Sequence, residues 1–476
     1  MAHVEGESRF QGSLFAPSLD ETIGADHPVR VIDAFVDSLD LGALGFSKVV
    51  AEATGRPPYR PRDLLKLYVY GYVSQVRSSR RLEKEAGRNL EVLWLINRLT
   101  PSFKTIADFR KDHPRAIVGV CRAFVRFCRT QALFGAEVLA IDGSKIEAVA
   151  SRKQVVTPKS AAKQIAALDR KIAEYLAAMD EADREEAAPA PAPADVAAAL
   201  QVLRERRDAV RREAEELAAE GLAQRVRSEP EARLMRTARH GHQVAYNAQT
   251  AVDAKHGLIA DFDLTNEGND ERQLHPMAAR GRAALEVEAV TVVADTGYSS
   301  GEQGRLCEEA GIAAIVPRAD TVNPAGAQYF PRTAFRYEAA SDAWQCPAGQ
   351  TLSRRQVSHS ERKWKYWTTA CRGCALKAQC TGAAKRTIVR GFDEEAREAM
   401  HRRATSDPRW MKLRRELVEH PFGTLKWMMG MPRFLVRGIE KAKAELALGI
   451  LGFNLKRAIN ILGVPALLAA LAAPGT

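Results

Sequence analysis

The chain has 476 residues, and its 46% hydrophobic content is enough to bury a sizeable core, which excludes disorder throughout. Its 70 Lys and Arg residues against 59 Asp and Glu residues give a net charge of +11, which suits a polyanionic partner. The longest apolar run covers residues 461–473 and contains Pro465, whereas a membrane span needs about 20 apolar residues. No secretory signal opens the chain, and its seven cysteines are too few for a disulfide scaffold. We therefore expect a soluble cytoplasmic protein with no membrane segment.

The positive charge is concentrated in two blocks. Residues 1–50 carry a net charge of −5, residues 51–130 carry +10, and residues 351–420 carry +9. In the first block, apolar periodicity predicts helices over 64–76 and 91–99, and Thr105 is expected to cap another. Basic helices of this kind suit phosphate contacts in a DNA-binding region, although a solvated helical face has the same charge pattern. The candidate DNA contacts are Arg60, Arg62, Arg77, Arg80, Arg81, Lys104 and Arg110.

A segment rich in Ala, Glu and Arg, residues 163–227, has the apolar spacing of a coiled coil. The run AAPAPAPA at 187–194 interrupts it, so we interpret the segment as an antiparallel helical hairpin with a structural or partner-binding role. The predicted seam consists of Ile165, Leu168, Ile172, Tyr175 and Met179, followed by Leu203, Val210 and Leu217.

Strand-like patterns lie on both sides of this hairpin. Residues 138–141 and 290–294 are short apolar runs, and residues 145–150 are a possible neighbouring strand. Residues 244–252 and 258–264 flank a turn at 253–257 and predict a β-hairpin. A helix over 301–310, a strand over 312–316, and helices over 394–426 and 439–461 follow. The pattern predicts an α/β core interrupted by insertions.

Two acids follow the apolar runs, Asp142 in VLAIDGSKIEA and Asp295 in VTVVADTGYSS. A carboxylate at the carboxyl end of a strand faces the edge of the sheet where ligands bind, although capping and turn aspartates look similar. In RRELVEHPFGTLKWMMG, the spacing of Arg415, Glu419 and Lys426 places them roughly on one helical face, as an exposed ion-paired face would also do. Three carboxylates can hold two Mg²⁺ ions about 4 Å apart for phosphoryl transfer.

At these residues the chain resembles bacterial insertion-sequence transposases of the DDE type. The family signature Y-x2-R-x3-E-x6-K is matched at Arg415, Glu419 and Lys426, whereas Lys412 stands at the tyrosine position. The two family aspartates match Asp142 and Asp295. Further similar motifs are SEPEARLM, YNAQTAVD, YRPRDLLKLYVYGYVSQVRSSRRLEKEAGRN, TPSFKTIADFR and FLVRGIEKAKAELALGILGFNLKR.

The resemblance implies a ribonuclease-H-like mixed sheet flanked by helices. The core would comprise residues 134–155, 229–320 and 393–476, preceded by an all-α DNA-binding domain over 1–133. A helical hairpin over 156–228 and a Cys-rich segment over 321–392 would interrupt it. These insertions would account for the long separations of the three acids, 153 and 124 residues.

The resemblance also implies a function. The protein would bind the terminal inverted repeats of an insertion sequence, cleave the DNA and join the freed 3′-hydroxyl to target DNA. Asp142, Asp295 and Glu419 would bind two Mg²⁺ or Mn²⁺ ions, and Arg415 and Lys426 would contact DNA. A homodimer would assemble the synaptic complex, and the DNA-bound protein would be nucleoid-associated. Two alternatives are a metal-dependent nuclease without joining activity and a non-catalytic DNA-binding protein derived from a transposase.

Four of the cysteines are grouped, in CPAG and in CRGCALKAQC. A CxxC pair can hold zinc because its two thiolates reach one tetrahedral centre, which two more thiolates complete. We therefore predict a structural zinc site, for which His359 is a substitute ligand. The alternative is four reduced, unliganded thiols. The predicted ligands are Cys346, Cys371, Cys374 and Cys380.

Overall fold

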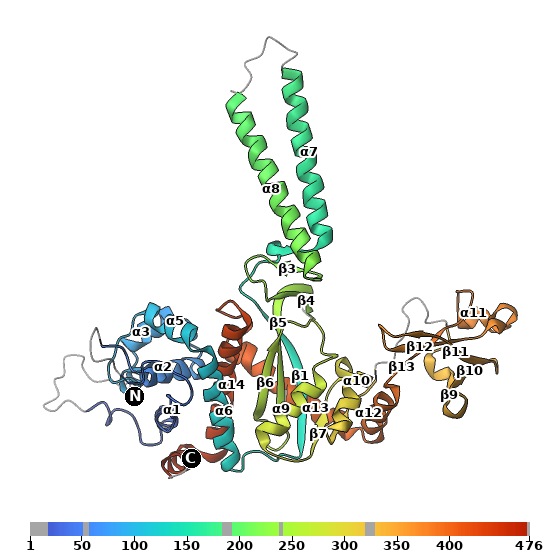
Figure 1. The fold of residues 1–476 in the computed structure, drawn as a ribbon. Coiled ribbons are helices and arrows are strands. Elements are labelled where there is room, and N and C mark those ends of the chain that lie inside the picture. Colours follow the sequence, from blue (N-terminus) through green and yellow to red (C-terminus); the bar gives the residue numbers. More distant parts are fainter. Residues whose placement is uncertain (1–17, 51–56, 183–192, 238–240, 319–328, 474–476) are drawn as a thin grey trace, which may run out of the picture.

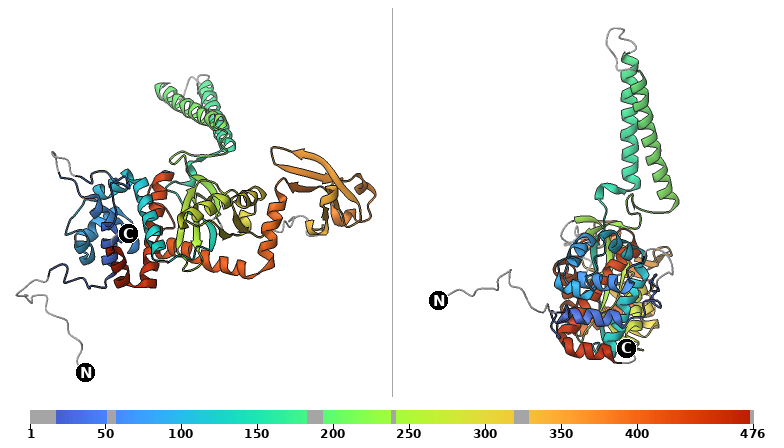
Figure 2. Two further views of the ribbon diagram at one scale, coloured as in Figure 1. Left: turned by 60° about the horizontal axis from the view of Figure 1, so that its bottom comes forward. Right: turned by 90° about the vertical axis from the view of Figure 1, so that its left-hand side faces the viewer.

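The computed structural model describes residues 18–50, 57–182, 193–237, 241–318 and 329–473 (Figure 1). A helical N-terminal region lies beside a central mixed sheet, and a second, smaller sheet lies on the far side of the central one. A long helical hairpin projects from the central sheet (Figures 1 and 2). The expectation of a mixed α/β core preceded by a helical region is thus confirmed.

In the described residues up to Thr130, six helices form the N-terminal region. Proline lies in the first turn of three of them, where its missing N–H leaves no intrahelical bond unmade. Ser102, and not the predicted Thr105, caps the fifth helix, because its hydroxyl accepts the N–H of Thr105. The helices are α1 (Pro28–Asp37), α2 (Pro61–Val73), α3 (Ser79–Ala86), α4 (Leu90–Leu95), α5 (Phe103–Asp112) and α6 (Pro114–Thr130).

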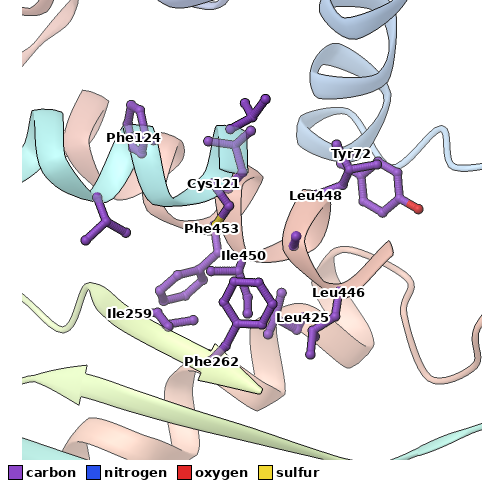
Figure 3. Packing of buried hydrophobic residues seen from close by; sticks show 14 of the residues in the cluster. Tyr72, Cys121, Phe124, Ile259, Phe262, Leu425, Leu446, Leu448, Ile450 and Phe453 are labelled. Atoms are coloured by element: carbon purple, nitrogen blue, oxygen red, sulfur yellow. The ribbon is translucent and has the colours of Figure 1, made fainter. Parts of the chain in front are cut away.

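The main hydrophobic core forms where these helices meet a long C-terminal helix, α14 (Ile439–Leu462), which packs against α2, α6 and the central sheet. Figure 3 shows Phe453 and Ile450 of α14 close to Phe262 of the sheet. Oδ1 of the buried Asn454 accepts the N–H of Ile259 at 2.9 Å, and its Nδ2 donates to the carbonyl of Ile259 at 2.8 Å. The hydrogen bonds satisfy this polar group inside the core.

Helix α15 (Val464–Ala472) follows α14 after a bend of 106°. In the described part of the chain, no single helix is long and apolar enough to cross a membrane, and α14 and α15 pass that test only as a bent pair.

The central sheet has the strand order β4-β5-β1-β7-β8, and β6 also pairs with β5. Strand β5 is antiparallel to β1, β4 and β6, whereas β7 is parallel to β1 and to β8. The predicted β5–β6 hairpin is present, and Gly257 adopts a φ of +64° in its turn. The strands are β1 (Val138–Glu147), β4 (Arg233–Thr237), β5 (Gly241–Asp253), β6 (Ile259–Thr265), β7 (Val290–Val293) and β8 (Ile312–Ile315).

Four more helices accompany this sheet. The predicted helix over 394–426 is broken at Asp407–Pro408, because proline disfavours a helical conformation in the preceding residue. Its second half ends in a π-helical turn, residues Thr424–Met428. The helices are α9 (Leu274–Leu285), α10 (Gly301–Glu309), α12 (Glu394–Ser406) and α13 (Arg409–Gly423).

The projecting hairpin consists of α7 (Pro158–Ala182) and α8 (Pro193–Ala219), joined at its base by β2 (Val155–Val156) and β3 (Arg225–Val226). Val210 and Leu217 are buried near that base, as is Ile172 further out, which fits the predicted seam. Tyr175 is 44% exposed, so this residue of the predicted seam is not buried between the two helices. The predicted helix break at 187–194 lies largely outside the described residues.

The second sheet is antiparallel throughout, in the order β13-β12-β11-β10-β9, and has its own small core around Tyr366 and Trp344. A short helix, α11 (Lys377–Cys380), lies between its last two strands along the chain. The strands are β9 (Arg336–Glu338), β10 (Ala343–Gln345), β11 (Thr351–Ser358), β12 (Lys363–Trp367) and β13 (Ile388–Gly391).

Candidate active site

Asp142 and Asp295 are brought together by the parallel pairing of β1 with β7. Ala140 lies opposite Val293 in that pairing, so each aspartate follows two residues later on its own segment. Asp295 caps the turn after β7 by accepting the N–H of Gly297 at 2.8 Å. Asp142 does not end its strand as predicted, because β1 continues to Glu147 along β5. The two acids nevertheless lie at one edge, where β7 ends beside β1.

One guanidinium joins the two acids. Nη2 of Arg414 on α13 lies 2.6 Å from Oδ1 of Asp142 and 3.2 Å from Oδ2 of Asp295. Burial raises the pKa of Asp142 to about 6; the charge of Arg414 opposes this shift, and that of Asp295 adds to it. Nε of Arg414 is buried and has no hydrogen-bond partner. The arrangement is a cation held between two carboxylates.

A third acid, Asp270, borders the same edge and was not predicted from the sequence. It lies in the loop between β6 and α9, and its Oδ1 accepts N–H groups from Asn247 and Gln249, each at 2.7 Å. Nζ of Lys145 lies 3.4 and 3.3 Å from its two carboxylate oxygens. Asn247 and Gln249 are fully buried on β5, opposite Lys145 and Gly143 of β1.

Gly143 lets Asp270 approach β1 next to Asp142. A Cβ added at residue 143 would lie 2.6 Å from Oδ1 of Asp270 and would collide with the amide of Gln249. The hydroxyl of Tyr298, buried after β7, donates to the other end of that amide, Oε1 of Gln249. Strand β5 thus carries a buried polar network that reaches both aspartate-bearing segments.

Lys426 and Glu419 have different positions relative to this edge. Nζ of Lys426 bonds the hydroxyl of Ser144 at 2.6 Å and the carbonyl of Lys145 at 2.8 Å, so it anchors the end of α13 to β1 just beyond Asp142. Glu419 is exposed on α13, and no ion pair or hydrogen bond found in the described residues joins it to either aspartate. Among those residues, no three Cys, His, Asp or Glu side chains are arranged as a metal site.

Two regions of the chain match known protein families. Residues 17–112 match a transposase domain (DUF772), and residues 345–459 match a transposase DDE domain. The two matches identify an insertion-sequence transposase of the DDE class. The second match covers α13 with Arg415, Glu419 and Lys426, whereas Asp142 and Asp295 precede it. No curated protein and no solved structure matches the chain.

Within the first match, the predicted DNA contacts of the transposase differ in their exposure. Arg77 and Arg110 are each only 7% exposed, so neither presents its guanidinium at the surface in this structure. Arg77 bonds the buried Glu445 and the carbonyl of Arg433, and Arg110 packs over the ring of Tyr68. Arg62 is paired with Asp37 at 3.3 Å. The exposed members are Arg60, Arg80, Arg81 and Lys104.

The four clustered cysteines of the transposase line one cavity of about 20 Å³, room for a single water-sized body. They are free thiols, and the N–H of Gln350 points to Sγ of Cys346 at 3.3 Å. Burial raises the pKa of Cys380, and the neighbouring cysteines add to that shift. His359 does not line this cavity and lies against Phe392 instead.

Proposed function

We propose that this DNA transposase binds the terminal inverted repeats of an insertion sequence and catalyses Mg²⁺-dependent strand cleavage and strand transfer. The observation that carries the proposal is the position of Arg414 between Asp142 and Asp295. Two carboxylates from distant parts of the chain share one cation there, in a protein whose other charges favour DNA. The arrangement supports a site for a divalent cation at the same edge.

Asp142 and Asp295 would hold the cation, and Glu419 would complete the triad from α13. Held by these residues, Mg²⁺ or Mn²⁺ would supply the Lewis acidity that activates a water or a 3′-hydroxyl and offsets charge on the leaving oxygen. Lys426 fixes the end of α13 against β1 through Ser144. The exposed Arg415, on the solvent side of α13, would contact a DNA phosphate.

The division of the chain follows the same proposal. The central sheet would be a ribonuclease-H-like core, interrupted by the α7–α8 hairpin and by the Cys-bearing sheet. Arg60, Arg80, Arg81 and Lys104 would hold DNA phosphates on the N-terminal helices, and a homodimer would pair two DNA ends. Incubation of the purified protein with a duplex bearing candidate repeats tests the function: Mg²⁺ should produce cleavage at the repeat ends, and chelation with EDTA should prevent it.

The Arg414→Gln substitution should tighten cation binding by the DNA-free protein about 10-fold, since a hydrogen bond to a charged group contributes about 1.5–3 kcal/mol. The guanidinium competes with the metal for both carboxylates, and glutamine removes that competing charge. Titration with Mn²⁺ followed by electron paramagnetic resonance measures the affinity. Arg415→Gln, one residue along the helix and exposed, is the matched control and should bind as the unsubstituted protein does. Equal affinities for both variants would refute the competition.

We also propose that Cys346, Cys371, Cys374 and Cys380 hold a structural zinc ion. Four free thiols around one cavity supply a suitable donor set. Cys374→Ser should therefore release about one zinc ion per chain and lower the thermal stability of the second sheet, because metal binding is coupled to folding. Atomic emission of the purified protein measures the metal. Cys307→Ala, at a buried thiol on α10 outside the cavity, should keep the zinc; a folded, zinc-free protein would exclude the site.

A further inference from the structure

The proposed triad does not account for Asp270. This carboxylate lies in the loop after β6, and its neighbours place it at the edge that carries Asp142 and Asp295. Its two oxygens are held unequally. Oδ1 accepts the two amide N–H groups of Asn247 and Gln249, and Lys145 is the sole other partner found for the carboxylate in the described residues.

The second oxygen of Asp270 lies near Gly297, in the segment that carries Asp295. A Cβ placed at Gly297 would lie 3.9 Å from Oδ2 of Asp270 and 3.0 Å from Oδ1 of Asp295, so both carboxylates border the same point. On the other side, Oδ1 of Asp270 lies against Gly143, next to Asp142. Asp270 therefore lies beside both acids that share the guanidinium of Arg414.

A buried acceptor at the same place points to a missing cation. Oδ1 of Asn247 is fully buried, has no hydrogen-bond partner, and lies 3.1 Å from a Cβ placed at Gly143. A buried carbonyl oxygen without a donor is costly, and a bound cation or its water shell would satisfy it. The orphan oxygen belongs to the amide whose Nδ2 donates to Asp270, so it lies directly beside that carboxylate.

Charge balance leads to the same conclusion. Asp142, Asp295 and Asp270 carry three negative charges, which Arg414 and Lys145 offset with two positive ones. These five groups together carry a net charge of −1, and Lys426, which bonds Ser144 just beyond Asp142, is the next cation along the edge. Departure of Arg414 would leave two uncompensated negative charges, which match one divalent cation.

We propose that Asp270 is a further carboxylate of the divalent-cation site, and that Lys145 neutralises it until the cation binds. The inference rests on the proposed function, since it adds a ligand to the site of Asp142 and Asp295. It gives the buried amides of Asn247 and Gln249 a role: they hold Oδ1 and leave Oδ2 directed at the cation.

Mn²⁺ binding by the DNA-free protein tests the inference without any activity readout. Asp270→Asn keeps an oxygen to accept the two amide N–H groups but removes the charge, so it should weaken binding about 10-fold or more in a protein that circular dichroism shows to be folded. Glu271→Gln, which removes an exposed acid one residue away, is the matched control and should change the affinity less than twofold. Affinity in Asp270→Asn equal to that of the control would overturn the inference.

Two further variants distinguish a ligand from a merely structural acid. Lys145→Gln should tighten Mn²⁺ binding several-fold, because it frees Asp270, whereas a purely structural pair would leave the affinity unchanged or weaken it. Asp142→Asn separates the inference from the proposed function. If Asp142→Asn weakens binding and Asp270→Asn does not, only the role of Asp270 is wrong; if neither weakens it, the proposed cation position is wrong as well.

Discussion

Asp142→Asn is expected to reduce the rate of DNA cleavage by about 10³-fold or more and to leave DNA affinity within about twofold. Asparagine has nearly the same shape as aspartate but lacks the charge that would bind the cation, and the cation contributes several kcal/mol of transition-state stabilisation. The side chain is only 19% exposed, so its replacement removes little surface that DNA could touch. Single-turnover cleavage and a fluorescence-anisotropy titration measure the two quantities.

The control for this prediction is Asp263→Asn on β6. Asp263 is ion-paired with Arg280 at 2.6 Å and with Lys443, away from the edge of the two acids, and its loss should leave cleavage almost unchanged. Asp295→Asn should behave as Asp142→Asn does, because the two acids hold the same guanidinium. Glu419→Ala tests the third member of the triad. Full cleavage by that variant would exclude Glu419 as the third metal-binding acid and make Glu416, on the same helix, the next candidate.

Glu445→Ala is expected to lower the free energy of unfolding by about 3–5 kcal/mol, the usual cost of breaking a buried ion pair. Glu445 is fully buried on α14 and accepts the N–H of Leu435 at 2.8 Å as well as the guanidinium of Arg77. Removal of the carboxylate leaves the charge of Arg77 buried between carbonyl groups. Thermal or urea unfolding measures the loss.

Substitution of Arg77 distinguishes a structural role, as the partner of Glu445, from a role in contacting DNA. If Arg77 is structural, Arg77→Ala destabilises the fold and does not reduce the salt dependence of DNA binding, which reports the number of phosphate contacts. Arg81→Ala, at an exposed position on α3, should do the reverse: stability within about 0.5 kcal/mol and a smaller salt slope. A normal stability for Glu445→Ala would show that the buried pair does not hold the helical region to α14.

The sequence pattern was sufficient for the elements that depend on local periodicity. The predicted strand over 290–294 is β7, and the predicted hairpin is α7 and α8, although its helices begin and end several residues earlier than expected. The strands predicted separately over 138–141 and 145–150 are one continuous strand, β1, which ends at Glu147. Each acid was predicted at a strand end, which holds for Asp295 after β7, whereas the parallel pairing of β1 with β7 that brings Asp142 beside it is a tertiary contact.

The contacts that depend on tertiary packing could not be predicted in this way. Adjacent residues on a helix point about 100° apart, so the burial of Val418 and Phe422 decides that Arg414, and not Arg415, reaches the acids. Asp270 lies in a loop with no periodic signal, and only the pairing of β5 with β1 places its amide partners beside Gly143. A buried arginine such as Arg77 looks like an exposed one in sequence.

A strand-transfer assay tests the central claim most directly. The protein is incubated with Mg²⁺, a duplex bearing the inverted repeats that flank its gene, and a target plasmid. We expect 3′ ends cleaved from the repeats to be joined to the target, and we expect no joined product from Asp142→Asn. Cleavage without joining would contradict transposition and favour a nuclease. Binding without cleavage, in either Mg²⁺ or Mn²⁺, would favour a non-catalytic DNA-binding protein.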